Sequence, residues 1–207
     1  MVADEGGTAE PVFSFFEDYV LEPFWTCDHM RKGQRIRDHY QWTHSNSLVQ
    51  RPEHPNELGV LSRNLDGLVW FDLTSGEMQD QLGGLAGTFA SEDPLFDHPH
   101  MSHAPTANRV LVFDNRLHSR EASRIVEVAL DPDTGTSEVV WSYTHPEIGN
   151  VGFLGDARRL PGGNTLVAWS DERRLTEVTP EGDIVWEVLV ADIKHLGRAE
   201  LWDAPLP

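Results

Sequence analysis

The sequence predicts an all-β fold of short antiparallel strands, and two observations lead to this prediction. From Leu58 onward, short runs of β-branched and aromatic residues are separated by Gly, Asp, Asn and Pro, as in strands joined by tight turns. A strand–turn–strand unit then occurs three times, and its turn glycines Gly76, Gly135 and Gly182 are spaced by 59 and 47 residues. This spacing is in the range of β-propeller blades, so we expect about three blades, half of a six-bladed propeller.

Each predicted blade is assembled from consecutive strands. The repeated unit, with its turn Gly suited to positive φ, reads LVWFDLTSGEMQDQLGG (68–84), RIVEVALDPDTGTSEVVWSY (124–143) and RLTEVTPEGDIVWEV (174–188). A further strand precedes each unit, in NELGVLSRN (56–64), NRVLVFDN (108–115) and GGNTLVAWSD (162–171). By the same alignment, WTHSNS (42–47) and FDHPHMSH (96–103) open the first and second blades. We expect RLPGGNTL (159–166) to be a hairpin turn, because Pro161 and the following strand do not suit a phosphate-binding loop.

The chain divides into an aromatic-rich N-terminal segment (1–40), a three-blade part (41–190) and a C-terminal tail (191–207). Within the first segment, PVFSFFEDYVLEPFW (11–25) is expected to be a short helix or strand that docks on the rest. Blades that cannot bury their own faces need neighbours. Three arrangements meet this need: a longer protein with further N-terminal blades, two copies that close the ring as a homodimer, or an open stack with an exposed edge.

The net charge limits the classes of partner. Asp and Glu number 34 against 16 Lys and Arg, a formal net charge of -18, which makes nucleic acid and anionic membranes poor partners. Lysine occurs only at Lys32 and Lys194. This composition suits a halophilic protein, because the Debye length of roughly 3 Å in 1 M salt screens self-repulsion. An acidic protein from a high-GC genome is the alternative.

The single cysteine and the N-terminal sequence bear on the compartment. Cys27 has no partner in the chain, so no intrachain disulfide and no Cys-based zinc site can form. MVADEGGTAEP (1–11) lacks the basic and apolar regions of a secretory signal, and no apolar run approaches the roughly 20 residues of a membrane span. We therefore expect a cytoplasmic protein.

The candidate site residues lie where the innermost strands of a propeller line its central channel. His44 and Asn46 open the first blade, and His100 opens the second. Arg63 and Arg124 occupy strand positions at which packing does not require a guanidinium. Equivalent blade positions converge on the channel, where Arg offers a planar fork of donors and His offers a donor or a neutral nucleophilic nitrogen. We therefore expect an anion site suited to sulfate or phosphate esters.

The histidines also fit roles away from an anion site. His98, His100 and His103 could form a His-rich surface loop, or a metal site to which Asp97 contributes. His44 could be a hydrogen-bonded core histidine.

Arg124 has a structural alternative too, an ion pair with Glu127 or with an acid of a neighbouring blade. A phosphate loop, a GxSxG nucleophile elbow and a GxGxxG fingerprint are all missing from the sequence.

Several segments, in one order from about Gln41 to Glu187, resemble the PAPS-independent arylsulfotransferase family, which moves a sulfuryl group from one phenol to another. The family patterns are D-W-T-H-x-N-S, then S-x-R with I-D-x-x-T-G-E and L-G-G, then Q-H-D with F-D-N, S-R-x-x-E-x-x-L-D, and a closing Q-R-L-P-x-G-N-T-L-V with V-W-E. The matching segments here are WTHSNS, LSRNLDGLVWFDLTSGEMQDQLGG, PHMSHAPTANRVLVFDN, SRIVEVALD and GDARRLPGGNTLVAWSDERRLTEVTPEGDIVWE. GRAELW (197–202) is also similar to the family.

The resemblance implies a role for each matched residue. His44 and His100 lie in the channel pocket, and Arg124 holds the sulfuryl oxygens. The partners implied are an aryl sulfate and a phenol, with no metal and no cofactor. The remaining residues expected to contact substrate are Asn46, Arg63, Ser102 and Asn115.

In the family's mechanism a histidine attacks sulfur and then passes the sulfuryl group to a phenol, while Arg and His donors stabilise charge on the sulfuryl oxygens. The family's nucleophile belongs near NVGFLGDARR (150–159), which contains no histidine, although His145 lies nearby. Pro99 and Met101 replace the Gln and Asp that flank the histidine matched by His100. A non-catalytic propeller module that binds a ligand or a protein through its channel or edge is the alternative function.

Overall fold

A computed structural model of the chain describes residues 2–3, 7, 9–15, 35–36, 39–40, 42–84, 87–91 and 94–201. Most of the predicted N-terminal segment, including Cys27 and the greater part of residues 11–25, lies outside the described residues. Two short two-stranded ribbons precede the main body. They are β1 (Val2–Ala3) with β2 (Ala9–Glu10), and β3 (Arg35–Ile36) with β4 (His39–Tyr40).

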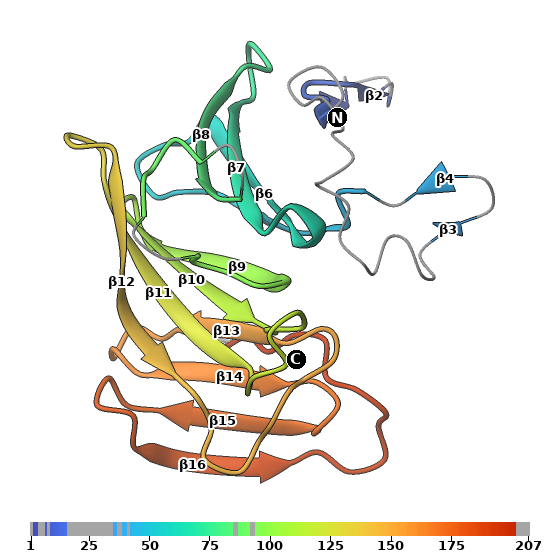
Figure 1. Cartoon of the computed structure of the whole chain (residues 1–207), viewed down its shortest axis with the longest axis vertical. Helices are drawn as coiled ribbons and strands as arrows, with labels where there is room; N and C mark the ends of the chain where they lie inside the picture. Colours follow the sequence, from blue (N-terminus) through green and yellow to red (C-terminus); the bar gives the residue numbers. More distant parts are fainter. Residues whose placement is uncertain are drawn as a thin grey trace.

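Three four-stranded antiparallel sheets form the main body, which confirms the predicted all-β architecture of three propeller-type blades (Figure 1). In each sheet the four strands are neighbours in chain order. Blade one comprises β5 (Ser45–Val49), β6 (Glu57–Ser62), β7 (Gly67–Asp72) and β8 (Met78–Gly83). Blade two comprises β9 (Pro99–Thr106), β10 (Arg109–Asp114), β11 (Arg124–Asp131) and β12 (Thr136–Tyr143). Blade three comprises β13 (Asp156–Arg159), β14 (Thr165–Trp169), β15 (Arg174–Val178) and β16 (Ile184–Leu189).

The turns before the outermost strands form as predicted. Gly76, Gly135 and Gly182 have φ values of 74°, 66° and 94°, the left-handed region that favours glycine. In the first two turns an aspartate at the strand end closes the loop. Asp72 accepts hydrogen bonds from two backbone N–H groups at 2.8 Å, and Asp131 accepts two at 3.0 and 3.3 Å.

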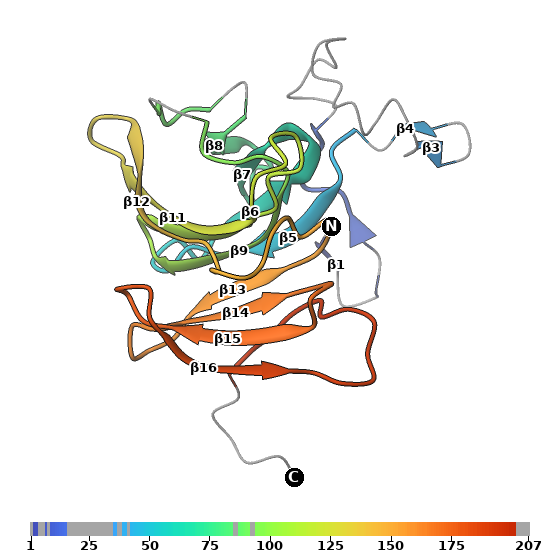
Figure 2. The ribbon, with the colours of Figure 1, turned by 60° about the horizontal axis from the view of Figure 1, so that its bottom comes forward.

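The inner strands β5, β9 and β13 lie side by side, so each blade contributes its first strand to the centre (Figure 2). A hydroxyl pair joins the first two blades, since Oγ of Ser47 lies 2.8 Å from Oγ of Ser102. Because all three inner strands run in the same direction along the axis, their N-terminal ends meet at one end of the molecule. The residues just before and after these strand starts therefore become spatial neighbours.

Apolar side chains fill the spaces between blades. One buried cluster joins blades one and two, and another joins blades two and three. In the second cluster, Phe113 and Trp169 meet edge to face with ring centroids 5.4 Å apart, and both side chains are fully buried. Pairwise packing of this kind explains why the repeat holds together as a stack.

The two outer faces of the stack differ. Phe13 stacks on Phe71 with centroids 4.7 Å apart, and together with Phe15 it packs against the outside of blade one. The described part of residues 11–25 therefore docks on the blades, as expected. On blade three, the outermost strand β16 exposes five apolar side chains: Ile184, Val185, Trp186, Val188 and Leu189. Among the described residues, no helix has the length and apolar character needed to cross a membrane.

Candidate anion site at the ends of the inner strands

Two imidazoles and a guanidinium gather where the inner strands begin. His44 immediately precedes β5, and His100 is the second residue of β9. Arg63 opens the short 3₁₀ helix η2 (Arg63–Leu65) after β6, whereas the sequence predicted a strand position for it. Its backbone N–H donates to the carbonyl of His44 at 3.3 Å, and Asn64 donates to Thr43 at 3.1 Å. These two bonds hold the turn that carries Arg63 against His44 and Thr43, just before β5.

A backbone carbonyl from blade three orients His100. Nδ1 of His100 lies 2.9 Å from the carbonyl oxygen of Gly155, so in the neutral ring Nδ1 carries the proton and donates it. Nε2 then keeps its lone pair. Gly155 has a φ of 103°, and a Cβ there would lie 2.6 Å from the ring of Phe113. Only glycine therefore allows this carbonyl to approach His100.

Burial and the local charges favour neutral imidazoles at this site. Burial lowers the pKa of His44, and the charge of Arg63 and then that of His100 lower it further. Burial also lowers the pKa of His100, opposed by its hydrogen bond to Gly155 and by the charge of Asp156. Arg63 acts on both rings and is itself buried, with 8% of its surface exposed. A fixed positive charge beside two neutral rings with nitrogen donors and acceptors suits an anion.

Left-handed backbone marks the same end of the molecule. The φ values of His44, Met101 and Leu154 are 48°, 48° and 56°. Such values are uncommon outside glycine and cost roughly 1–3 kcal/mol at a residue that does not favour them. His44 itself belongs to the candidate site, Met101 follows His100, and Leu154 precedes Gly155. The tertiary structure thus holds strained backbone around the candidate site.

Two of the predicted substrate contacts have protein partners instead. The side-chain amide of Asn46 donates to the carbonyl of Pro99 at 2.9 Å, and its oxygen accepts from the N–H of Met101 at 3.2 Å. Ser102 is buried and bonded to Ser47. Asn46 and Ser102 therefore fasten blade one to blade two beside the site.

Asn115 holds the loop that carries Gly155. Its side-chain amide donates to the carbonyls of Val151 at 2.9 Å and Leu154 at 3.0 Å, and the residue is buried. This arrangement places the Gly155 carbonyl against His100, so Asn115 acts on the site through the loop. In the sequence, Gly155 could have been connected with the site through its position just before the first strand of blade three. This is the segment in which the family's nucleophile is expected.

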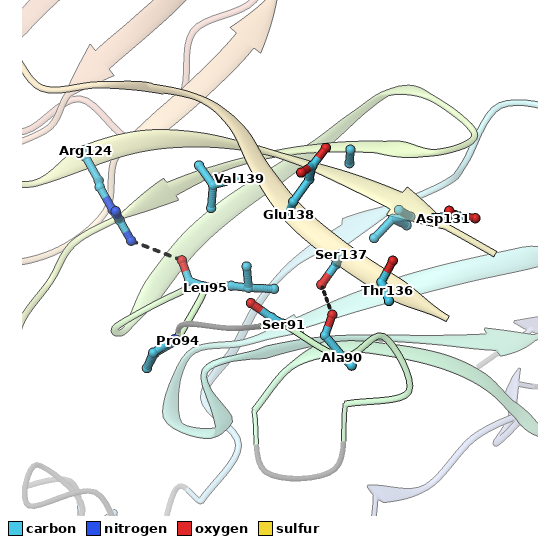
Figure 3. Close-up of a pocket in the computed structure, with 12 residues that line it drawn as sticks. Ala90, Ser91, Pro94, Leu95, Arg124, Asp131, Thr136, Ser137, Glu138 and Val139 are labelled. Atoms are coloured by element: carbon cyan, nitrogen blue, oxygen red, sulfur yellow. Dashed lines mark hydrogen bonds between the residues drawn. The ribbon is translucent and has the colours of Figure 1, made fainter. Parts of the chain in front are cut away.

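Arg124 lies outside the group formed by His44, Arg63 and His100. It is the first residue of β11, and the strand register Pro99–Asp114–Arg124 puts it two strands outward from the start of β9. Its Nε donates to Asp114 at 2.9 Å, and a terminal nitrogen donates to the carbonyl of Leu95 at 3.3 Å. There it lines a separate cavity of about 910 Å³ between β12 and the segment that links the blades (Figure 3). This differs from the channel position that the resemblance implies, and Arg124 pairs with an acid of its own blade.

The three histidines of FDHPHMSH point to separate partners. His98 is fully buried, with Nδ1 3.2 Å from Asp97, whereas His100 faces Gly155. Nδ1 of His103 accepts from the backbone N–H of Arg159 at 3.2 Å. These three side chains therefore neither form one metal site nor share a surface loop.

His145 belongs to the interior of blade three. It is buried, its Nε2 lies 2.8 Å from Glu187, and its Nδ1 accepts from the backbone N–H of Glu147 at 3.1 Å. Both ring nitrogens are engaged, so His145 is not placed to act at the inner strand ends.

In the His103→Gln variant, the free energy of unfolding is expected to fall less on acidification than it does in wild type. Burial, followed by the charges of Arg158 and Arg159, lowers the pKa of His103 to about 4. The unfolded chain takes up this proton near pH 6.5. The neutral ring's contribution is therefore complete above pH 6.5, and it is lost as the pH falls through about 4. Urea unfolding of both proteins between pH 7 and 4 should show that the free energy of unfolding falls more in wild type than in the variant as the pH decreases. A difference that does not change with pH would contradict the expectation.

No protein-family model matches the sequence, and no curated protein matches it. Among solved structures, the chain is similar to a periplasmic gluconolactonase of Pseudomonas aeruginosa (TM-score 0.47, 16% identity, 74% of this chain and 41% of that chain covered). It is also similar to a virginiamycin B lyase of Staphylococcus aureus (0.46, 13%, 73% and 43%) and to the WD40 propeller domain of Doa1 (0.48, 12%, 71% and 41%). The chain spans about two fifths of the length of these three proteins.

Proposed function

We propose that the chain binds an aryl sulfate at the group formed by His44, Arg63 and His100, and transfers its sulfuryl group to a phenol. The observation that carries the proposal is that residues far apart in sequence meet at the inner strand ends as two neutral imidazoles and a buried guanidinium. The resemblance of the sequence to arylsulfotransferases supports the choice of a sulfuryl group among anions.

In the first step of the proposed reaction, the Nε2 lone pair of His100 attacks sulfur. An N–S bond forms, the bond from sulfur to the phenolic oxygen breaks, and the phenolate leaves with the electron pair. The hydrogen bond from Nδ1 to Gly155 keeps Nε2 unprotonated for this attack. Arg63 stabilises the charge on the three sulfuryl oxygens in the transition state.

In the second step, the oxygen of the acceptor phenol attacks the same sulfur. The N–S bond breaks, and its electron pair returns to Nε2 of His100. The phenol proton passes to neutral His44, whose lowered pKa keeps it ready to accept, and then to water.

Arg63→Gln is expected to lower the transfer rate by about 100-fold to 1,000-fold, since it removes the positive charge proposed to stabilise the sulfuryl oxygens in the transition state. The measurement is the release of a chromogenic phenol from its sulfate ester, with and without a second phenol as acceptor, in molar KCl. Arg109→Gln is the matched control, because Arg109 opens β10 at the opposite end of the blade.

Equal transfer rates in Arg63→Gln and Arg109→Gln would show that Arg63 does not act at the proposed site. Release that does not depend on the acceptor would argue for hydrolysis in place of transfer.

The second candidate function is a binding module without catalysis. The observation that favours it is that β16, the outer strand of blade three, exposes five apolar side chains, which alternate between the two sides of the strand. Two copies of three blades would complete a six-bladed ring, so the partner proposed for this strand is a second copy of the chain. A folded wild type that dimerises and releases no phenol would favour this candidate.

A further inference from the structure

We propose that Asp66, His98 and His118 bind a divalent transition-metal ion of the Zn²⁺ class. The three residues come from separate elements: Asp66 follows η2 in blade one, His98 precedes β9, and His118 lies between β10 and β11. One ligand atom from each lies within 4.8 Å of the other two. The site is distinct from the proposed anion site, because it uses neither His44 nor His100.

The side-chain geometry is close to that of a bound site. Oδ1 of Asp66 accepts the backbone N–H of His98 at 2.7 Å and lies 4.0 Å from Nδ1 of the same residue. The rings of His98 and His118 have centroids 4.0 Å apart at an interplanar angle of 63°. Zinc binds imidazole nitrogen and carboxylate oxygen at about 2.0–2.2 Å. Small side-chain rotations would therefore bring the three atoms onto one ion.

Asp97 contacts the ring of His98 and the backbone of His118. One of its carboxylate oxygens lies 3.2 Å from Nδ1 of His98. The same carboxylate accepts the backbone N–H of His118 at 2.9 Å and that of Ser119 at 2.8 Å. In metal sites, a carboxylate that contacts a ligating histidine fixes the orientation of its ring. The loop carrying His118 is thus held against His98 before any ion binds.

Charges of both signs surround the site. The negative charges of Asp97 and Asp114 act on Asp66, and so does the positive charge of Arg63. Arg124 pairs with Asp114. Two imidazoles with one carboxylate favour Zn²⁺ and its transition-metal neighbours over Ca²⁺ and Mg²⁺, which prefer oxygen ligands alone.

The position of the site predicts a structural consequence. An ion held by Asp66 and His98 would join blade one to blade two, and His118 would tie in the loop after β10. An ion that binds only the folded chain raises its stability by mass action. We therefore expect the Tm of the chain to rise when Zn²⁺ is added.

The test uses the full chain, treated with a chelator and dialysed, and titrated with ZnCl₂ by calorimetry, with Co²⁺ absorption spectra as a second readout. Wild type should bind one ion, and its Tm should rise when Zn²⁺ is added. His118→Ala should bind about tenfold more weakly or worse and lose the gain, because a ligand is removed from an exposed position where the fold tolerates the change. His195→Ala is the matched control, since it removes another exposed imidazole, one that contacts Phe153.

Asp66→Asn should weaken binding as well, with nearly unchanged side-chain volume. Absence of one-to-one binding by folded wild type would overturn the proposal. Equal affinities of wild type and His118→Ala would also overturn it, because the ion would then bind elsewhere. Neither readout depends on turnover, so the metal site and the proposed transferase activity can fail independently.

Discussion

His100→Ala is expected to reduce sulfuryl transfer by about a thousandfold or more, with the fold retained. Loss of the nucleophile removes the covalent route, and only binding and electrostatic stabilisation remain. The His100 ring is oriented by its hydrogen bond to Gly155, and its side chain is half-buried at the strand ends. Circular dichroism and the turnover assay on the same sample measure the two parts of this expectation.

A direct test looks for the covalent intermediate. Wild type incubated with an aryl sulfate and no acceptor should gain the mass of one sulfuryl group, and peptide mapping should place it on His100. Addition of phenol should remove it. His54→Ala is the control, since His54 is a partly exposed imidazole paired with Glu57 on blade one.

Sulfurylation of another residue would contradict the role given to His100. Full turnover by His100→Ala would contradict it as well.

Arg124→Ala is expected to lower the free energy of unfolding by about 2–4 kcal/mol, because it leaves a buried carboxylate without its cation. The side chain of Asp114 is 0% exposed, and that of Arg124 is 23% exposed. Burial raises the pKa of Asp114, and the bond from Arg124 opposes that rise. Urea unfolding measures the change, with Arg109→Ala as a control for loss of one arginine at the start of β10.

A second substitution separates a structural role of Arg124 from a role in binding. Asp114→Asn in the Arg124→Ala background removes the unpaired charge and should restore part of the stability. The resemblance to arylsulfotransferases implies instead that Arg124 holds sulfuryl oxygens. Unchanged stability of Arg124→Ala together with lost turnover would favour that role.

The blades could be predicted from the sequence because their cause is local. Alternating apolar residues and turn residues set strand and hairpin within about twenty positions, and Gly76, Gly135 and Gly182 marked the turns by their need for positive φ. The positions of His44 and His100 also followed from sequence, since both stand at the start of an inner strand.

The neighbours of those residues were decided only by tertiary structure. Arg63 lies beside His44 because the backbone N–H of Arg63, at the start of a 3₁₀ turn, donates to the carbonyl of His44. The Gly155 carbonyl contacts His100 from a different blade. Arg124 was expected in the channel, but its distance from the axis depends on which strand of the blade carries it.

The sequence by itself therefore determined the strands, the turns and the repeat of this protein. Tertiary structure alone decided which side chains meet, including Asp66, His98 and His118. The physical reason is that strand and turn preferences act between near neighbours in the chain. Contacts between blades depend instead on register, sheet twist and close packing summed over the whole stack.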